Sequence, residues 1–123
     1  MSQEELKTRL LSDLSQLNLP VDEVDLFIRP FSKTYYGRYF PVCDDKLLKP
    51  KIYVYPYENE MGDFMSYDKV LDTAIHELIH HKQYTNDCFT RVKGVMHDTE
   101  FWKLYNHYMN RAKKYQMIGG EIS

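Results

Sequence analysis

The segment of residues 67–84 constrains the fold of this chain more than any other, because its apolar side chains cover a wide stripe of a helix. These side chains recur at helical spacing: Val70, Leu71, Ala74, Ile75, Leu78 and Ile79. A stripe of this width predicts a helix that is packed deeply against other elements. The remaining segments must therefore supply the layers that cover it.

Two further helices are predicted, one near each end of the chain. Residues 3–17 follow Ser2, and Glu5 lies three positions after that serine, which is the pattern of a capping box. Pro20 disfavours helix at the residue before it, so the first helix should end ahead of this proline. Residues 98–116 again repeat apolar side chains at helical spacing, which predicts the last helix.

Three strands are predicted between the first and second helices. Residues 24–31, 34–42 and 51–57 are rich in β-branched and aromatic side chains. The link at residues 32–33 is short enough for a hairpin, so we expect three antiparallel strands and, with the helices, an α+β domain. Gly37 lies inside the second strand, where a glycine predicts a bulge or a close approach to the backbone.

The composition favours an ordinary globular protein. A length of 123 residues predicts one domain over residues 1–123 with one modest core. No apolar run reaches about 18 residues, so no membrane span is expected, and the polar N-terminus is unlike a secretory signal. The two cysteines, Cys43 and Cys88, predict free thiols in a reducing compartment. We expect a cytoplasmic monomer.

The charges are unevenly distributed, although the net charge of −2 gives no overall attraction to nucleic acid. Residues 29–51 contain several basic side chains, two acids and many aromatic rings. The basic residues are Arg29, Lys33, Arg38, Lys46, Lys49 and Lys51. This composition is typical of a surface that contacts single-stranded DNA or RNA, which predicts weak binding at most. The alternative is an amphipathic sheet whose solvent-facing side carries lysines.

The sequence HELIHH at residues 76–81 lies within the central predicted helix. His76 and His80 are four positions apart, so at about 100° per residue they project from nearly the same side. Their ring nitrogens can therefore converge on one zinc ion, Zn2+. Glu77 projects about 100° away from His76, where it can serve as the general base toward a zinc-activated water without being a ligand.

A catalytic zinc needs a third protein ligand and an open position. His81 follows His80 directly, so it faces about 100° away from the site and is expected to pack or hydrogen-bond toward the core. The other downstream candidates are His97, Glu100 and His107, and their spacing leaves all three open. The group that would stabilise an oxyanion is also open, among Tyr35, Tyr36, Arg38, Tyr84 and His107.

The motifs HELIHH and HDTEFW resemble those of the SprT-like zinc metallopeptidases, in which H-E-x-x-H is followed by H-x-x-E and an aromatic residue. The resemblance, over residues 24–115, implies that His97 completes the zinc site of His76 and His80, and that Glu77 is the general base. It also implies a minimal zincin-like domain. In such a domain, a small three-stranded antiparallel sheet packs on the active-site helix, with two further helices.

The function implied by the resemblance is that of a zinc metalloendopeptidase acting on extended polypeptides. Two alternatives involve nucleic acid: a binding module whose zinc is structural, and a DNA–protein crosslink protease that acts with a separate DNA-binding partner. A metal hydrolase that cleaves a non-peptide amide is a third. The motif glutamate favours an enzyme, because a structural zinc needs no base and prefers four protein ligands.

Overall fold

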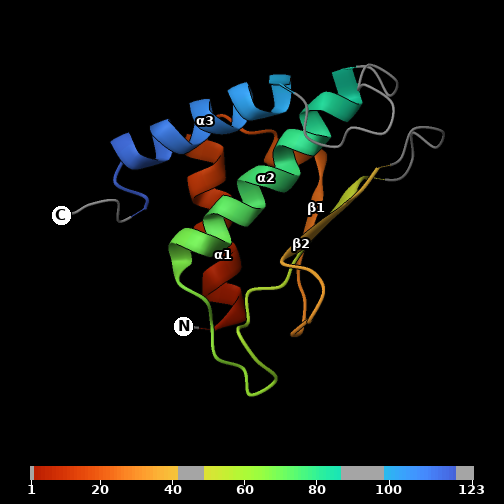
Figure 1. Cartoon of the computed structure of the whole chain (residues 1–123), viewed down its shortest axis with the longest axis vertical. Coiled ribbons are helices and arrows are strands. Elements are labelled where there is room, and N and C mark those ends of the chain that lie inside the picture. Colours follow the sequence, from red (N-terminus) through yellow and green to blue (C-terminus); the bar gives the residue numbers. More distant parts are fainter. Residues whose placement is uncertain (1, 42–48, 87–98, 119–123) are drawn as a thin grey trace.

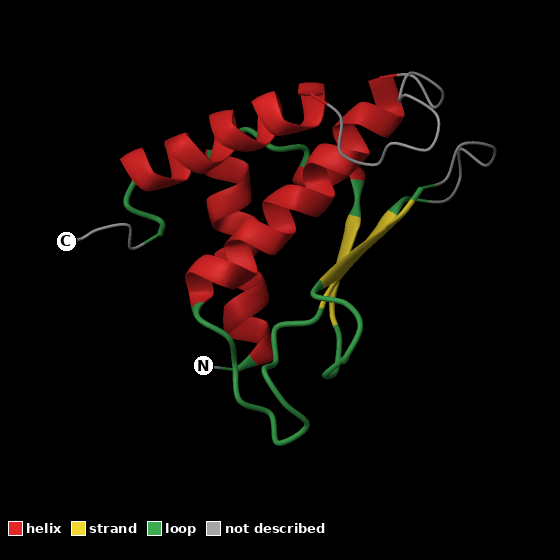
Figure 2. Cartoon of the chain, viewed as in Figure 1, coloured by secondary structure: helices red, strands yellow, loops and turns green. Residues whose placement is uncertain are grey.

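The computed structural model describes residues 2–41, 49–86 and 99–118. The elements follow the order α1 (Gln3–Gln16), η1 (Val21–Glu23), β1 (Asp25–Ile28), β2 (Gly37–Phe40), β3 (Lys51–Val54), α2 (Tyr67–Asn86) and α3 (Thr99–Lys114), as Figure 2 shows. The α+β class and the three predicted helices are confirmed, and both hydrogen bonds of the capping box between Ser2 and Glu5 are present. The short 3₁₀ helix η1 was not predicted.

The sheet differs from the prediction, because it is mixed rather than antiparallel. The strand order is β1-β3-β2, with β3 parallel to β1 and antiparallel to β2. The expected hairpin after β1 does not form. Instead, the Ser32 hydroxyl oxygen accepts hydrogen bonds from the N–H groups of Thr34 and Tyr35, both at 3.1 Å, in a local turn before β2. Strand β3 lies at the centre of the sheet, and its Ile52 and Val54 side chains are buried.

The register of the sheet assigns each residue to one of two faces. The inner face, toward α2, carries the paired sets Leu26–Ile52–Tyr39 and Ile28–Val54–Gly37. The outer face carries the sets Phe27–Tyr53–Arg38 and Asp25–Lys51–Phe40. Because successive residues of a strand point to opposite faces, the same three strands present an apolar inner side and an aromatic, charged outer side.

Helix α2 is the centre of the molecule, as its wide apolar stripe predicts. It runs between α3 and the sheet, with α1 crossing behind it (Figure 1). All six stripe residues are buried, and they join one hydrophobic cluster with residues of α1, β1, β3 and α3. No helix in the described ranges is both long enough and apolar enough to cross a membrane. Cys43, Cys88 and His97, and therefore the predictions made for them, lie outside the described residues.

Candidate metal centre

The imidazoles of His76 and His80 point toward each other on the side of α2 that faces α3. Their Nε2 atoms are 3.2 Å apart, and their ring centroids are 4.9 Å apart. His80 is only 6% exposed, whereas His76 is half-buried. The convergence expected from a spacing of four residues on a helix is therefore present between these two side chains.

The donor set fits a zinc ion. Two nitrogen ligands at about 2.0–2.1 Å from a tetrahedral zinc are separated by about 3.3 Å. The observed separation of the two Nε2 atoms, 3.2 Å, matches that geometry. A single ion placed between the two nitrogens would thus need little rearrangement of either side chain.

Phe101, in the first turn of α3, packs on both imidazoles. Its ring centroid lies 4.8 Å from the ring of His76 and 4.8 Å from the ring of His80, and its side chain is fully buried. The aromatic position of the HDTEFW motif therefore forms one wall of the histidine pair. The motif includes Phe101, but nothing in its spacing gives this contact.

The third ligand is not present among the described residues. Within residues 2–41, 49–86 and 99–118, no cluster of three or more histidine, cysteine, aspartate or glutamate side chains could hold a metal ion. Glu100 is described, lies in the first turn of α3 and is exposed. His97, the ligand implied by the resemblance, lies outside the described residues. The structure thus brings together two of the predicted ligands and leaves the third a prediction.

Glu77 lies on a different side of α2, toward β2. Its side chain is 7% exposed, and this burial raises the pKa of its carboxyl group to about 7. Gly37 of β2 lies directly against this side chain. A Cβ added at Gly37 would lie 3.1 Å from Oε2 of Glu77 and 2.6 Å from Cγ2 of Thr73. The close backbone approach predicted for this glycine is confirmed, and it is directed at the candidate general base.

A cleft of about 290 Å³ opens beside the two motif residues His76 and Glu77. It lies between α2 and the chain that leads into β2, and its lining residues are Thr34, Tyr35, Tyr36, Gly37, Asp72, Thr73, His76 and Glu77. Asp72 accepts a hydrogen bond of 2.7 Å from the Tyr105 hydroxyl, which links α2 to α3 at the edge of the cleft. A substrate in this cleft would reach both motif residues.

The candidates for oxyanion stabilisation separate into different regions. Tyr35 and Tyr36 line the cleft, so they stay candidates. The Arg38 guanidinium instead stacks over the rings of Tyr35 and Phe40 on the outer face of the sheet. His107 is exposed on α3 beside Tyr108. The side chain of Tyr84 lies outside what the structure describes.

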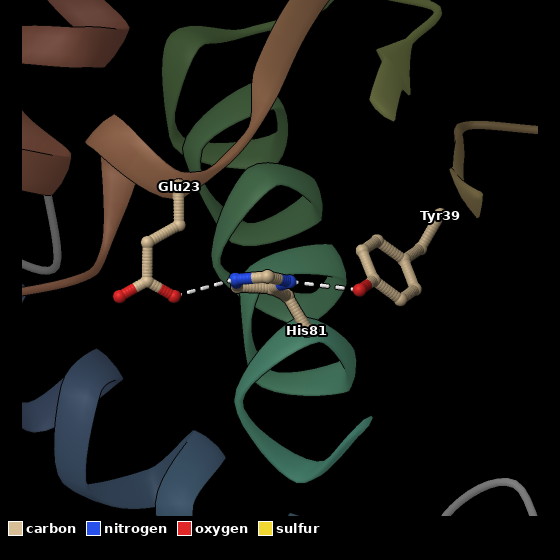
Figure 3. Close-up of polar contacts among 3 residues, drawn as sticks. All are labelled: Glu23, Tyr39 and His81. Atoms are coloured by element: carbon tan, nitrogen blue, oxygen red, sulfur yellow. Dashed lines mark hydrogen bonds and ion pairs between the residues drawn. The ribbon is translucent and has the colours of Figure 1, made fainter. Parts of the chain in front are cut away.

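His81 is separate from the metal pair, as its position on the helix predicts. Its side chain is 1% exposed and lies between Tyr39 of β2 and Glu23 of η1 (Figure 3). Nδ1 is 2.7 Å from the Tyr39 hydroxyl oxygen, and Nε2 is 2.8 Å from Oε1 of Glu23. The core-side hydrogen bonding expected of His81 is confirmed, but neither partner was predicted, since one lies 42 and the other 58 positions away.

The outer face of the sheet carries a continuous group of rings and guanidinium groups, which we call the aromatic face. It consists of Phe27, Arg29, Tyr35, Arg38, Phe40, Tyr53 and Tyr55. Tyr53 is its centre: its ring centroid lies 5.7 Å from that of Phe27 and 4.8 Å from that of Phe40. Of the basic and aromatic segment 29–51, Arg29, Tyr35, Arg38 and Phe40 contribute to this surface, whereas Tyr39 lies on the inner face.

Comparisons with protein-family models, with curated proteins and with solved structures found no match to this chain.

Proposed function

We propose that this protein is a zinc-dependent peptidase of the SprT-like type. The observation that carries the proposal is a pair of convergent imidazole nitrogens, 3.2 Å apart, of which His76 lines the same cleft as the buried carboxyl group of Glu77. His76 and His80 would hold the zinc, and Glu77 would be the general base. When bound, zinc supplies a water of lowered pKa and a positive charge that polarises a substrate carbonyl.

The contribution of Glu77 follows from its burial. In the zinc-free protein, burial raises the pKa of this carboxyl group to about 7, so it takes up a proton more readily than an exposed glutamate does, as a general base must. Gly37 packs closely against one side of the Glu77 carboxyl group. Glu77 lies beside His76 but on the β2 side of the helix. Its Oε1 or Oε2 can therefore reach a water in the cleft without occupying a ligand position.

His97 is our proposed third ligand. Phe101 lies only four positions after His97 and is packed on both zinc-binding imidazoles, so the chain adjoining this histidine is close to the site. Glu100 is the rival, and its exposed side chain forms no three-ligand cluster with the two histidines in the described residues.

The substrate we propose is an extended polypeptide. The sheet order makes β2 the edge strand nearest the cleft, and an extended segment can add to such an edge through main-chain hydrogen bonds. A peptide bound beside β2 would run along the side of the sheet where Gly37 meets Glu77. The cleft would then place a carbonyl near both motif residues.

The test of this function is cleavage of an unfolded protein by the zinc-loaded chain and by Glu77→Gln. The glutamine keeps the shape of the side chain but cannot accept the proton, so turnover should fall by about 10²–10⁴-fold while zinc content stays the same. A chelator should abolish cleavage by the parent protein. Equal, chelator-sensitive cleavage by Glu77→Gln would remove the glutamate from the mechanism. No cleavage by the parent, with a fourth protein ligand on the metal, would favour structural zinc.

A second candidate function is weak binding of single-stranded nucleic acid on the aromatic face. The observation that favours it is the combination of exposed aromatic side chains and two guanidinium groups: Phe27 and Tyr35 are 40% and 41% exposed, and Arg29 and Arg38 stack among the rings. Asp25 is the one acid within the outer-face pairs of the described sheet, where Lys51 lies opposite it. Such binding would bring a peptidase to a nucleic acid–bound substrate in the cytoplasm.

A further inference from the structure

His81 is the one histidine of HELIHH that the proposed zinc chemistry leaves without a role. The sequence contains two interleaved pairs with a spacing of four residues. His76 and His80 form the first, on the side toward Phe101 of α3. Glu77 and His81 form the second, and both of these meet β2, at Gly37 and Tyr39 respectively. The second pair therefore shares one side of α2.

The hydrogen bonds of His81 have a defined direction. The carboxylate of Glu23 can only accept, so Nε2 of His81 carries the proton and donates across the 2.8 Å contact. In the neutral imidazole, Nδ1 then accepts from the Tyr39 hydroxyl at 2.7 Å. The fully buried ring is thus tied at both nitrogens, to η1 on one side and to β2 on the other (Figure 3). A ring that is hydrogen-bonded at both nitrogens fixes the distance between its two partners.

The contacts of the second pair form consecutive steps between α2 and β2. Four residues of a helix advance about 6 Å, and two residues of a strand advance about 6.8 Å. Gly37 to Tyr39 is a step of two on β2, and Glu77 to His81 is a step of four on α2. The two contacts are therefore separated by nearly the same distance along α2 and along β2. The Tyr39–His81 hydrogen bond thus determines where Gly37 meets Glu77.

We propose that His81 is a positioning residue, which holds β2 against α2 through Tyr39 and so keeps Gly37 packed on the carboxyl of Glu77. Glu23 holds the imidazole in the tautomer that can accept from Tyr39. The catalytic consequence rests on the proposed function, because it requires Glu77 to be the base. The structural part does not, and it can be measured in the zinc-free protein.

The test is a double-mutant cycle between Gly37→Ala and Tyr39→Phe, read as melting temperature in the presence of a chelator. In the parent, alanine forces a contact of 2.6 Å with Thr73, so the melting temperature should fall by about 5–10 °C. In the Tyr39→Phe background, β2 can move away from α2. Gly37→Ala should then lower the melting temperature by less than half as much as in the parent. Coupling of this kind is absent between independent sites.

Tyr67→Phe is the matched control. It likewise removes a donating tyrosine hydroxyl, whose acceptor here is the carboxylate of Asp13 rather than an imidazole, but it lies at the other end of α2. Gly37→Ala should lower the melting temperature in this background by as much as in the parent. An equal decrease in the parent, Tyr39→Phe and Tyr67→Phe proteins would overturn the proposal. If a double variant does not fold, hydrogen exchange decides: Tyr39→Phe should speed exchange of the β2 amides by about tenfold relative to Tyr67→Phe, and unchanged rates would overturn it.

Kinetics of the zinc-loaded protein test the catalytic part. Tyr39→Phe should lower kcat by about tenfold with KM and zinc content unchanged, as for loss of a supporting residue, and Glu23→Gln should act in the same direction. A kcat equal to that of Tyr67→Phe would overturn the positioning role. Absence of cleavage by the parent would instead contradict the proposed function, and the result of the cycle would still decide how β2 is held.

Discussion

Two sides of helix α2 carry histidines, and their surroundings differ. On the side toward α3, His76 and His80 bring two nitrogen atoms to within 3.2 Å of each other, under the ring of Phe101. On the side toward β2, His81 has both nitrogens bonded to other elements of the protein. On one side the two imidazole nitrogens face each other, in the arrangement that we propose for a metal pair, whereas on the other side an imidazole joins α2 to β2 and η1. Position on the helix, not residue type, decides the role.

Among the variants discussed below, removal of the proposed third zinc ligand should have the largest effect, and it tests the metal-binding role that we assign to the α3 side. His97→Ala should weaken zinc binding by more than about 100-fold, since losing a ligand should cost at least as much as losing a supporting residue. Glu100→Ala, the matched control in the same segment, should keep the metal. Metal analysis after dialysis against a weak chelator measures both. If Glu100→Ala loses zinc and His97→Ala keeps it, our ligand assignment is wrong.

Much of this contrast could be predicted from the sequence, because it depends on local spacing. A period of about 3.6 residues places His76 with His80 and turns His81 away, and the structure confirms both statements. Capping and apolar spacing likewise gave the three helices. Gly37 was predicted to allow a close approach, and it does. Each of these inferences needs only neighbours within a few positions along the chain.

The features that were predicted wrongly, or not predicted, depend on contacts between residues far apart in sequence. The strand order β1-β3-β2 could not be predicted from the sequence. The chain could form a hairpin after β1 or insert β3 between β1 and β2, and the choice depends on which strand packs at the centre of the sheet. The partners of His81 come from η1 and β2, and no periodicity links them to α2. The contact of Phe101 with the imidazoles depends on the packing of α3. Tertiary packing supplied all three.

The burial of Glu77 on the β2 side predicts that the stability of the protein depends on pH, and this effect should be intermediate in size. Burial raises the pKa of Glu77 from 4.5 to about 7 in the folded, zinc-free protein. The folded state therefore holds this proton more tightly than the unfolded state. The corresponding stability is fully present below pH 4.5 and is lost as the pH rises through about 7. Glu77→Gln cannot ionise, so above pH 7 it should be more stable than the parent by up to about 3 kcal/mol.

Urea unfolding of the parent and of Glu77→Gln at pH 4 and pH 8, with chelator present, measures this difference. Glu100→Gln is the control, because it neutralises an exposed carboxylate of α3. Its stability should follow that of the parent at both pH values. A constant difference between the parent and Glu77→Gln across this range would mean that the carboxyl is not desolvated, and that the β2 side of the helix is open to water.

The aromatic face gives the smallest expected effect, and it extends the comparison to the far side of the same sheet. If single strands stack there, Phe27→Leu should weaken binding by about tenfold, because leucine fills space without a π-face. Arg38→Gln should lower the salt dependence by about one phosphate contact. Tyr115→Leu is the control: Tyr115 is 45% exposed and lies beside Arg111, away from the sheet. Fluorescence anisotropy with a labelled oligonucleotide, at several salt concentrations, measures all of these. Because the inner face of the sheet, not the outer, meets α2, Phe27→Leu should alter neither zinc content nor peptide cleavage. Arg38→Gln is left out of the cleavage comparison, because the Arg38 guanidinium stacks on Tyr35, which lines the cleft. Tight binding that survives Phe27→Leu and Arg38→Gln would place the nucleic-acid contact elsewhere, and loss of cleavage would show that the two faces are coupled.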